Sequence, residues 1–502
     1  MNARVAAERP AATSLPAVAD VVVIGAGFGG LATALTLAEA GAAVVLIEAL
    51  NYPGGCASTF HRGGYAFESG ATLLSGFGEG QLMQRLIERH HIDVVIDWLD
   101  PVIELVTPDL RLPIWRDRAR LVESFCALPG APVEGLRRFF SHQQRVADAL
   151  WDLFASPELL PPFGLAELLR HLPRTPRYFP ILPLLGKSLA SVAARDGCGD
   201  FEPLRVYLDA LCQITVQTAA VEAEAPIALA ATDYPFRGTA HVRGGVGQLA
   251  WGLWHAVEAA GGSVHLATRA RGLRRERDRW IVSTRRGEVA APTAVTNLLP
   301  QTVRRLADLA TPELADLGDR LEEGWGAVMW YLGLRADAIA HDDAHHLELI
   351  ADPSAPFVEG NHIFCSLSAR RETERAPAGQ RTLTMSTHLA AERLRCASSQ
   401  GELVADVQAR MRETLRRLAP EIDAAIVTAM PASPRTFARF TGRPDGLVGG
   451  IPRRAGLSQY TALRPRPFAP GLHLVGDTVF PGQSTLATAI GGIKAAEAIL
   501  RG

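Results

Sequence analysis

Residues 22–30 read VVIGAGFGG, a short apolar run that ends in a cluster of glycines. A run rich in β-branched residues is typical of a buried parallel strand, and Leu31–Ala40 has the pattern of a helix with small residues on one face. Ala43–Ile47 predicts a second buried strand, which ends at Glu48. The order strand, glycine turn, helix and strand predicts a βαβ unit.

The glycines of this turn have the GxGxxG spacing of a dinucleotide site. Gly25 permits the tight turn, Gly27 lets the backbone approach a pyrophosphate, and Gly30 allows close packing of helix on strand. The free N–H groups at the helix N-terminus favour phosphate. Glu48 stands where a carboxylate binds ribose hydroxyls and repels a 2′-phosphate, which disfavours NADP.

A second glycine motif, near the C-terminus, favours FAD over NAD. The apolar run 472–475 leads to Gly476-Asp477, and a helix is expected to begin near Gln483–Leu486. An aspartate there can bind the ribityl or pyrophosphate region. The positive end of the helix would face the flavin N1–C2=O2 edge and stabilise the charge of a reduced flavin. The alternative for Asp477 is a capping or turn aspartate.

At 502 residues the chain is too long for one compact core, so an α/β protein with two domains or more is expected. We expect a Rossmann-type FAD-binding domain built from three chain segments, and an inserted α+β substrate-binding domain with a mixed or antiparallel sheet and a helical cap. The first domain is expected to combine residues 20–80, 235–300 and 440–502. The second is expected to combine residues 81–234 and 301–439.

Within these domains the pattern predicts individual elements. Gln81–Ala231 is expected to be mostly helical, and Leu403–Leu418 to be a helix. An antiparallel group is expected after the strand Ser263–Leu266, from Trp280–Thr284, Glu288–Ala290 and Ala294–Asn297. The strands expected in a second sheet are Trp325–Leu334, His346–Ile350, His362–Ser368 and Thr382–His388.

Composition excludes some functions. A net charge of −2 argues against nucleic-acid binding. The six cysteines form no CxxC pair or zinc-like spacing, so no metal site is expected, and reduced thiols indicate a cytoplasmic setting. Residues 1–19 have the composition of a flexible tail rather than a signal peptide. Val21–Gly41 is apolar enough to suggest a membrane span, but its glycines fit a buried strand-turn-helix better.

Four further motifs carry a resemblance to a known family. They are GGCASTF at residues 54–60, YAFESGAT at 65–72, GGVG at 244–247, and GD followed by PGQ within 476–483. With the N-terminal βαβ unit, they stand in the order seen in carotenoid-modifying flavoenzymes. The chain resembles the phytoene desaturase superfamily of FAD-dependent oxidoreductases, and within it the prolycopene isomerase and carotenoid 3,4-desaturase branch.

The resemblance implies one FAD held noncovalently. Ala270 would contact the adenine through its backbone. Cys56 stands where many relatives carry arginine, so that phosphate contact would be lost. The residues expected at the cofactor are Gly25, Gly27, Phe28, Gly29, Gly30, Glu48, Ala49, Gly54, Gly55, Cys56, Ala57, Ala270, Gly476, Asp477, Gln483, Ser484, Thr485 and Leu486.

The expected substrate is a long apolar polyene, a carotenoid or related isoprenoid, that is desaturated by hydride transfer to flavin N5. The alternatives are a redox-neutral cis–trans isomerase, a saturase of the retinol type, an amine oxidase and a non-enzymatic carrier. His61, Arg62 and Glu68 are weak catalytic candidates near the flavin, and the alternative for each is ordinary hydrogen bonding. Tyr234 and Phe236 are expected to flank a substrate tunnel or to lie in the core.

The apolar, proline-punctuated segment 159–194 has two interpretations. It is either a monotopic patch that admits lipid-dissolved substrate or a packed helical cap. The first predicts a peripheral contact with the inner face of the cell membrane. The electron acceptor is not indicated by the sequence.

Overall fold

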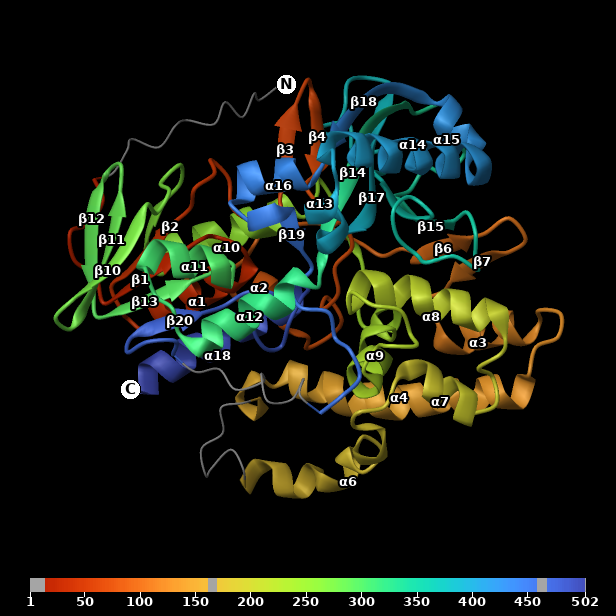
Figure 1. Ribbon diagram of the computed structural model, residues 1–502, viewed down its shortest axis with the longest axis horizontal. Helices are drawn as coiled ribbons and strands as arrows, with labels where there is room; N and C mark the ends of the chain where they lie inside the picture. The colour runs from red at the N-terminus through yellow and green to blue at the C-terminus, as the bar shows by residue number, and fades with distance from the viewer. Residues whose placement is uncertain (1–13, 161–168, 458–466, 502) are drawn as a thin grey trace.

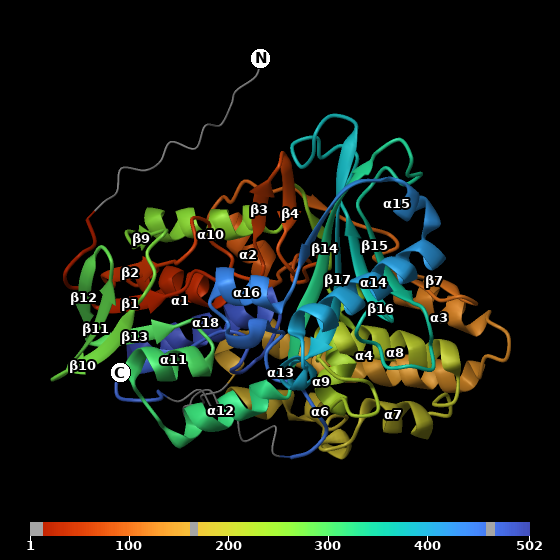
Figure 2. The same cartoon turned by 45° about the horizontal axis from the view of Figure 1, so that its top comes forward.

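Two sheets organise the computed structural model, which describes residues 14–160, 169–457 and 467–501. Figures 1 and 2 show a nucleotide-binding unit beside a second unit, in which a long sheet lies over a layer of helices. The two units meet where the strands of the first sheet end. The predicted α/β class, with a Rossmann-type unit and a second unit of sheet and helices, is confirmed.

A five-stranded parallel sheet contains the N-terminal motif (Figure 1). The strand order β20-β13-β1-β2-β9 places the start, middle and end of the chain side by side. Val22 pairs with both Val45 and Ala294, which brings the carboxyl ends of these strands to one edge. The strands are β1 (Val21–Ile24), β2 (Val44–Ile47), β9 (Ser263–His265), β13 (Thr293–Thr296) and β20 (Leu472–Leu474).

Alternate residues of this sheet are buried against different layers. Val21 and Val23 of β1 pack in one core with three helices, whereas Val22 and Ile24 pack in another with a small antiparallel sheet. The helices are α1 (Phe28–Glu39), α10 (Gly247–Ala259) and α18 (Thr485–Arg501). The second layer contains β10 (Gly272–Glu276), β11 (Arg279–Thr284), β12 (Gly287–Ala291), α11 (Pro300–Ala307) and α12 (Pro312–Glu322).

The second sheet is mixed: β15 pairs with β6 in parallel, and all other neighbouring strands of this sheet pair antiparallel. One face packs against α14 (Gln400–Leu418), and the other faces the nucleotide unit and the helices. In sheet order the strands are β18 (Ile426–Ala432), β14 (Trp325–Arg335), β17 (Gln380–Ala390), β16 (His362–Leu367), β15 (His345–Ile350), β6 (Ile103–Val106) and β7 (Arg111–Ile114), and β19 (Leu447–Val448) pairs with β14.

A helical layer lies beneath the second sheet (Figure 2). Its core is built from apolar faces such as Leu136, Phe139 and Phe140 of one helix against Leu204 and Tyr207 of another. The helices of this layer are α3 (Arg118–Cys126), α4 (Val133–Ala155), α6 (Thr175–Tyr178), α7 (Leu189–Arg195), α8 (Glu202–Thr215) and α9 (Ala225–Ala231).

Short elements join the units. The hairpin of β3 (Thr59–Arg62) and β4 (Tyr65–Glu68) leads from the nucleotide unit to the second sheet. A two-stranded ladder connects β5 (Ile96–Asp97) with β8 (His241–Val242). The remaining helices are α2 (Leu82–Arg89), α13 (Ala391–Cys396), α15 (Pro420–Ala424) and α16 (Pro434–Thr441).

The block 81–231 is mostly helical where the structure describes it, as predicted, but it also contributes β6 and β7 to the second sheet. These strands are short, and β6 pairs with β15 some 240 residues later (Glu104 with Leu347), which no local pattern shows. Ala294–Asn297 does not join the antiparallel group; β13 pairs in parallel with β1 and β20 instead.

The apolar stretch Val21–Gly41 is not a membrane span. It folds as β1, a glycine turn and α1, as expected. In the part of the chain that the structure describes, no helix has the length and apolar character needed to cross a bilayer.

Candidate cofactor and substrate site

A cavity of about 1010 Å³ lies between the parallel sheet, the second sheet and the helices. It begins at the carboxyl ends of β1, β2 and β13, which is where open α/β sheets bind ligands. Every residue expected at the cofactor lines it except Gly30. The motifs at 22–30, 48–49, 54–57 and 476–486, which are remote in sequence, therefore meet in one cavity.

The glycine turn after β1 packs tightly against Asn297. Gly25 has a φ of +100°, which L-residues with side chains rarely adopt. A Cβ at Gly30 would lie 2.0 Å from the carbonyl oxygen of Gly25, which is the close packing predicted for this glycine. A Cβ at Gly27 would lie 2.4 Å from Asn297 Nδ2. A side chain at Gly27 would therefore require the Asn297 amide to move.

Glu48 is held rigidly at the end of β2. Its carboxylate accepts hydrogen bonds of 2.8 Å from the backbone N–H groups of Ala26 and Leu50. Burial raises the pKa of Glu48, and these hydrogen bonds oppose that effect. A carboxylate can accept more hydrogen bonds than these, so capacity for ribose hydroxyls is left on the cavity side.

Asp477 is paired with an arginine that the sequence did not single out. Arg443 Nη2 donates to Asp477 Oδ2 at 2.6 Å, and Arg443 Nε donates to the carbonyl oxygen of Leu447. Burial lowers the pKa of Arg443, but the charge of Asp477 more than offsets this and the pKa is raised. Cys56 is close by, with a pKa raised by burial, and is a neutral thiol. Arg443 thus supplies a cation beside Cys56.

Helix α18 begins at the cavity wall. Gln483, Ser484, Thr485 and Leu486 line the cavity, so the N-terminal end of the helix faces into it. Ser484 Oγ accepts from the backbone N–H of Ala487 at 3.0 Å and caps the helix. The Gln483 side chain donates to the carbonyl oxygen of Ile214 at 2.7 Å, which ties this turn to α8. The positive end of the helix dipole is therefore fixed toward the cavity.

The other end of the cavity is apolar. It extends from the nucleotide motifs to the helical layer and the second sheet. Tyr234 lines it, whereas Phe236 does not; the Arg118 guanidinium lies over the Phe236 ring at 4.1 Å from its centroid. The apolar lining residues here include Leu160, Ile181, Ile214, Val216, Ile227, Met329 and Phe364.

The described parts of the predicted segment 159–194 lie at the mouth of this apolar end. Residues 161–168 lie outside the described part of the chain. Ile181, Leu182 and Leu185 line the cavity, whereas Leu172 and Phe179 are 65% and 60% exposed. The segment thus has an apolar face toward the cavity and apolar side chains toward solvent.

The weak catalytic candidates lie elsewhere. His61 and Arg62, which were expected near the cofactor, are exposed on β3 and do not line the cavity. Local sequence could not show that the hairpin turns outward at its tip. Glu68 is buried, but it also lies off the cavity. It accepts from the Val246 N–H at 3.3 Å and pairs with Arg375 at 3.5 Å.

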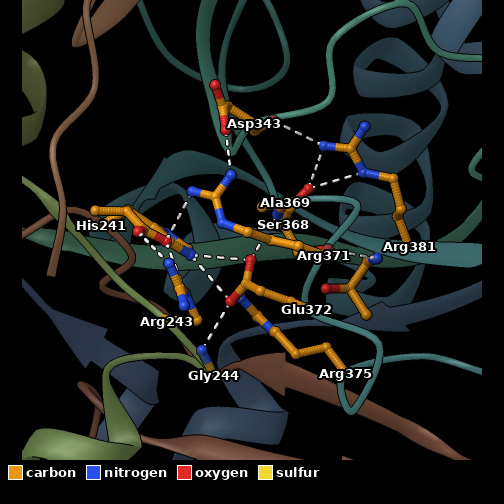
Figure 3. Close-up of polar contacts among 12 residues, drawn as sticks. His241, Arg243, Gly244, Asp343, Ser368, Ala369, Arg371, Glu372, Arg375 and Arg381 are labelled. Carbon is orange, nitrogen blue, oxygen red and sulfur yellow. Dashed lines mark hydrogen bonds and ion pairs between the residues drawn. The ribbon is translucent and has the colours of Figure 1, made fainter. Parts of the chain in front are cut away.

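Through Arg375, Glu68 is linked to a buried polar network centred on Glu372. Figure 3 shows the contacts around Glu372. The Glu372 carboxylate accepts from the backbone N–H groups of Gly244 (2.7 Å) and Ala369 (2.5 Å), and it pairs with His241 Nε2 at 3.1 Å. Burial raises the pKa of Glu372, but His241 and the other partners outweigh it and lower the pKa to about 2. The network binds the 368–376 loop of the second unit to the GGVG turn of the first.

Sequence reasoning missed several residues that line the cavity. Asn297 and Arg443 meet the glycine motifs, and His388 and Ser386 lie on β17 at the apolar end. Asn297 is the last residue of the predicted strand Ala294–Asn297. Its position at the carboxyl end of a strand could have identified it as a residue of the site. The others lie in regions without a motif.

Comparisons with known proteins agree with this geometry. Residues 23–89 match the family model of an NAD(P)-binding Rossmann-like domain. The carrot (Daucus carota) prolycopene isomerase is 25% identical over 96% of this chain and 80% of its own length. Human all-trans-retinol 13,14-reductase is 26% identical over 50% of this chain and 42% of its own. The lycopene-forming phytoene desaturase of a Paracoccus species is 33% identical over 26% of each.

The homologues of this chain are carotenoid and retinol enzymes. The resemblance predicted from the motifs is confirmed, as is the expectation of an enzyme, since these relatives are named isomerase, desaturase and reductase. Two solved structures share the fold. An oxidoreductase from Methanosarcina mazei is 17% identical with a TM-score of 0.62, over 95% of this chain and 99% of its own. Putrescine oxidase bound to putrescine is 16% identical with a TM-score of 0.63, over 97% and 99%.

Proposed function

We propose that this chain is an FAD-dependent oxidoreductase that desaturates a long apolar polyene, a carotenoid or related isoprenoid. One observation carries the proposal: a single cavity joins the dinucleotide motifs at one end to a long apolar wall at the other. A polyene at the apolar end and a flavin beside Asp477 and α18 would share this space. The relatives named for carotenoid and retinol chemistry support the same reading.

The residues present fit FAD. Glu48 would hold the adenosine ribose, and the glycine turn at 25–30 would receive the pyrophosphate. Asp477, fixed by Arg443, would bind the ribityl region. The N-terminus of α18 would face the flavin ring. When bound, FAD would supply the hydride acceptor for oxidation of a C–H bond.

The chain itself would position the substrate and exclude water. A polyene has no polar handle, so the apolar wall of Ile214, Met329 and Phe364 would orient it through contact area alone. The apolar walls would limit access of water to the reacting carbons and so protect a cationic polyene from capture.

Redox-neutral isomerisation is the second candidate. The prolycopene isomerases, unlike the phytoene desaturase, match along nearly the whole chain, over 96% of it. The same cavity would hold a cis polyene in a geometry that favours the trans isomer.

One experiment separates the candidates. The purified FAD-loaded protein is incubated with acyclic and cyclic carotenoids, with and without an electron acceptor, and the products are analysed by mass and chromatography. A product lighter by two hydrogens supports desaturation, and an isomer of unchanged mass supports isomerisation. A gain of two hydrogens under reducing conditions would identify a saturase instead. Inertness toward every polyene would overturn the proposal.

We also propose that residues 169–185 contact a lipid surface at the cavity mouth. Leu172 and Phe179 project apolar side chains outward, and Arg174 and Arg177 lie between them, which suits an interface of acyl chains and anionic headgroups. A polyene dissolved in the bilayer would then enter between Ile181 and Leu185. The cytoplasmic setting and the peripheral contact with the cell membrane remain part of this proposal.

A further inference from the structure

Ser386 and His388 are two of the polar side chains at the largely apolar end of the cavity, where Thr215 and Tyr234 also line the wall. Ser386 and His388 stand two residues apart on β17, so both project from the same face of the sheet, and both line the cavity. Their neighbours on the cavity wall include Met329 and Phe364, which offer no hydrogen bond. The wall is therefore not built for hydrocarbon alone.

The orientation of His388 is set by α8. Gln213 Nε2 lies 3.4 Å from His388 Nδ1 and donates to it, so the ring proton is carried by Nε2. Burial, and then the neighbouring His362, lower the pKa of His388 to about 3, and the ring is neutral. His388 therefore offers one N–H donor on its other ring nitrogen.

Within the described residues, neither His388 Nε2 nor Ser386 Oγ has a hydrogen-bond partner in the protein. A polar group that loses water on ligand binding must be paired again, or the complex is weakened. A pure hydrocarbon would leave both groups unpaired. A ligand with an oxygen atom beside Ser386 and His388 would form hydrogen bonds with both groups.

We propose that the substrate is a polyene that carries a hydroxyl or carbonyl oxygen, and that Ser386 and His388 recognise this oxygen. The proposal rests on the proposed function, because it assumes that the apolar end of the cavity holds a polyene. His388 donates from Nε2 to the oxygen, and Ser386 donates to or accepts from it. These residues determine specificity and the placement of the polyene; they take no part in bond making.

The test compares matched ligands on the FAD-loaded protein. An acyclic polyene hydrocarbon and its monohydroxy and monoketo derivatives, with the same carbon skeleton, are titrated from detergent micelles, and binding is followed by quenching of tryptophan fluorescence. We expect an oxygenated derivative to bind about five- to tenfold more tightly than the hydrocarbon, as one hydrogen bond allows. Ser386→Ala and His388→Phe should each reduce this preference by weakening the binding of the oxygenated derivatives and not that of the hydrocarbon.

Two further variants sharpen the result. His388→Gln keeps an N–H donor and should preserve much of the preference. Ser366→Ala is the control, because Ser366 is a buried serine of the adjacent strand β16 that does not line the cavity, and it should leave the preference intact.

Three results would overturn the inference. The first is equal affinity of the wild type for hydrocarbon and oxygenated ligands. The second is an equal loss for both ligand types in His388→Phe. The third is a shift of the flavin absorption spectrum in ligand-free His388→Phe, which would place the side chain against the cofactor. Failure of every polyene to bind would sink the proposed function as well, whereas equal binding of all of them sinks only this inference.

Discussion

Arg443 Nη2 donates to Asp477 Oδ2 at 2.6 Å, which joins the segment after α16 to the Gly-Asp motif at the end of β20. Both residues line the cavity, and Cys56 lies beside them. The pair fixes the aspartate side chain toward the expected ribityl region. Arg443 also places a positive charge beside Cys56, whereas the GGCAS motif itself contains no charged residue.

Arg443→Ala is expected to weaken FAD binding. The change removes a cation from the cofactor region and leaves Asp477 without its charged partner, and charge-assisted hydrogen bonds of this kind correspond to about a tenfold to hundredfold change in affinity. Titration of apoprotein with FAD measures the effect. Arg435→Ala, at an exposed arginine on the preceding helix α16, is the control. Unchanged FAD affinity in Arg443→Ala would contradict this role.

Gly27→Val should give a protein that folds but does not retain FAD. The new side chain would overlap Asn297 Nδ2, since a Cβ alone comes within 2.4 Å, and it would fill the space of the pyrophosphate. Gly401→Val is a matched control, because a Cβ at Gly401 meets no atom within 4 Å. Absorbance in the flavin bands measures the bound FAD, and circular dichroism measures the folding. A yellow, FAD-loaded Gly27→Val protein would refute the assignment of this turn.

His388 should make the fold sensitive to acid. Its pKa is about 3 in the folded protein against an ordinary 6.5, so the neutral ring stabilises the fold fully above pH 6.5. This stability is lost as the pH falls from 6.5 toward 3, by up to about 1.4 kcal/mol per pH unit. His388→Gln should therefore lose less stability than the wild type between pH 7 and pH 5 in urea unfolding. Parallel losses in the two proteins would show that another group is responsible.

Glu372→Ala should destabilise the junction between the two units. It removes the acceptor shared by Gly244, Ala369 and His241 and leaves buried donors unpaired, at a cost of about 3 kcal/mol. Thermal unfolding should begin several degrees lower. Glu374→Ala, an exposed glutamate two residues away, should unfold as the wild type does. Similar unfolding temperatures of the two variants would show that the Glu372 network does not hold the two units together.

Leu172→Glu combined with Phe179→Glu should abolish binding to vesicles that contain anionic lipid. Both side chains are more than half exposed at the cavity mouth, so charges there would oppose insertion without disturbing the core. We expect the wild type to float with the vesicles and the double variant to sediment. Val427→Glu, at an exposed valine on β18, should float normally. A wild type that never floats would exclude the lipid contact.

Local sequence was enough for the nucleotide end of the cavity. The glycines at 25, 27 and 30, Glu48 and the Gly-Asp turn at 476–477 act within a few residues of a strand end, so their spacing alone predicts where their backbone and side chains lie. The second-sheet strands between Trp325 and Ala390 were also predictable, because they are rich in β-formers, whereas β18 and β19 were not predicted.

Tertiary structure decided the rest. The strands at 103–114 are short and take their place from β15, which lies over 200 residues away. Arg443 reaches Asp477, and Gln213 sets the ring of His388, only because separate helices and strands are packed together. Likewise, His61 follows the motif in sequence but points to solvent. Sequence determined the dinucleotide end through contacts between near neighbours. Only the fold determined the substrate end, whose walls come from segments that are brought together by long-range packing.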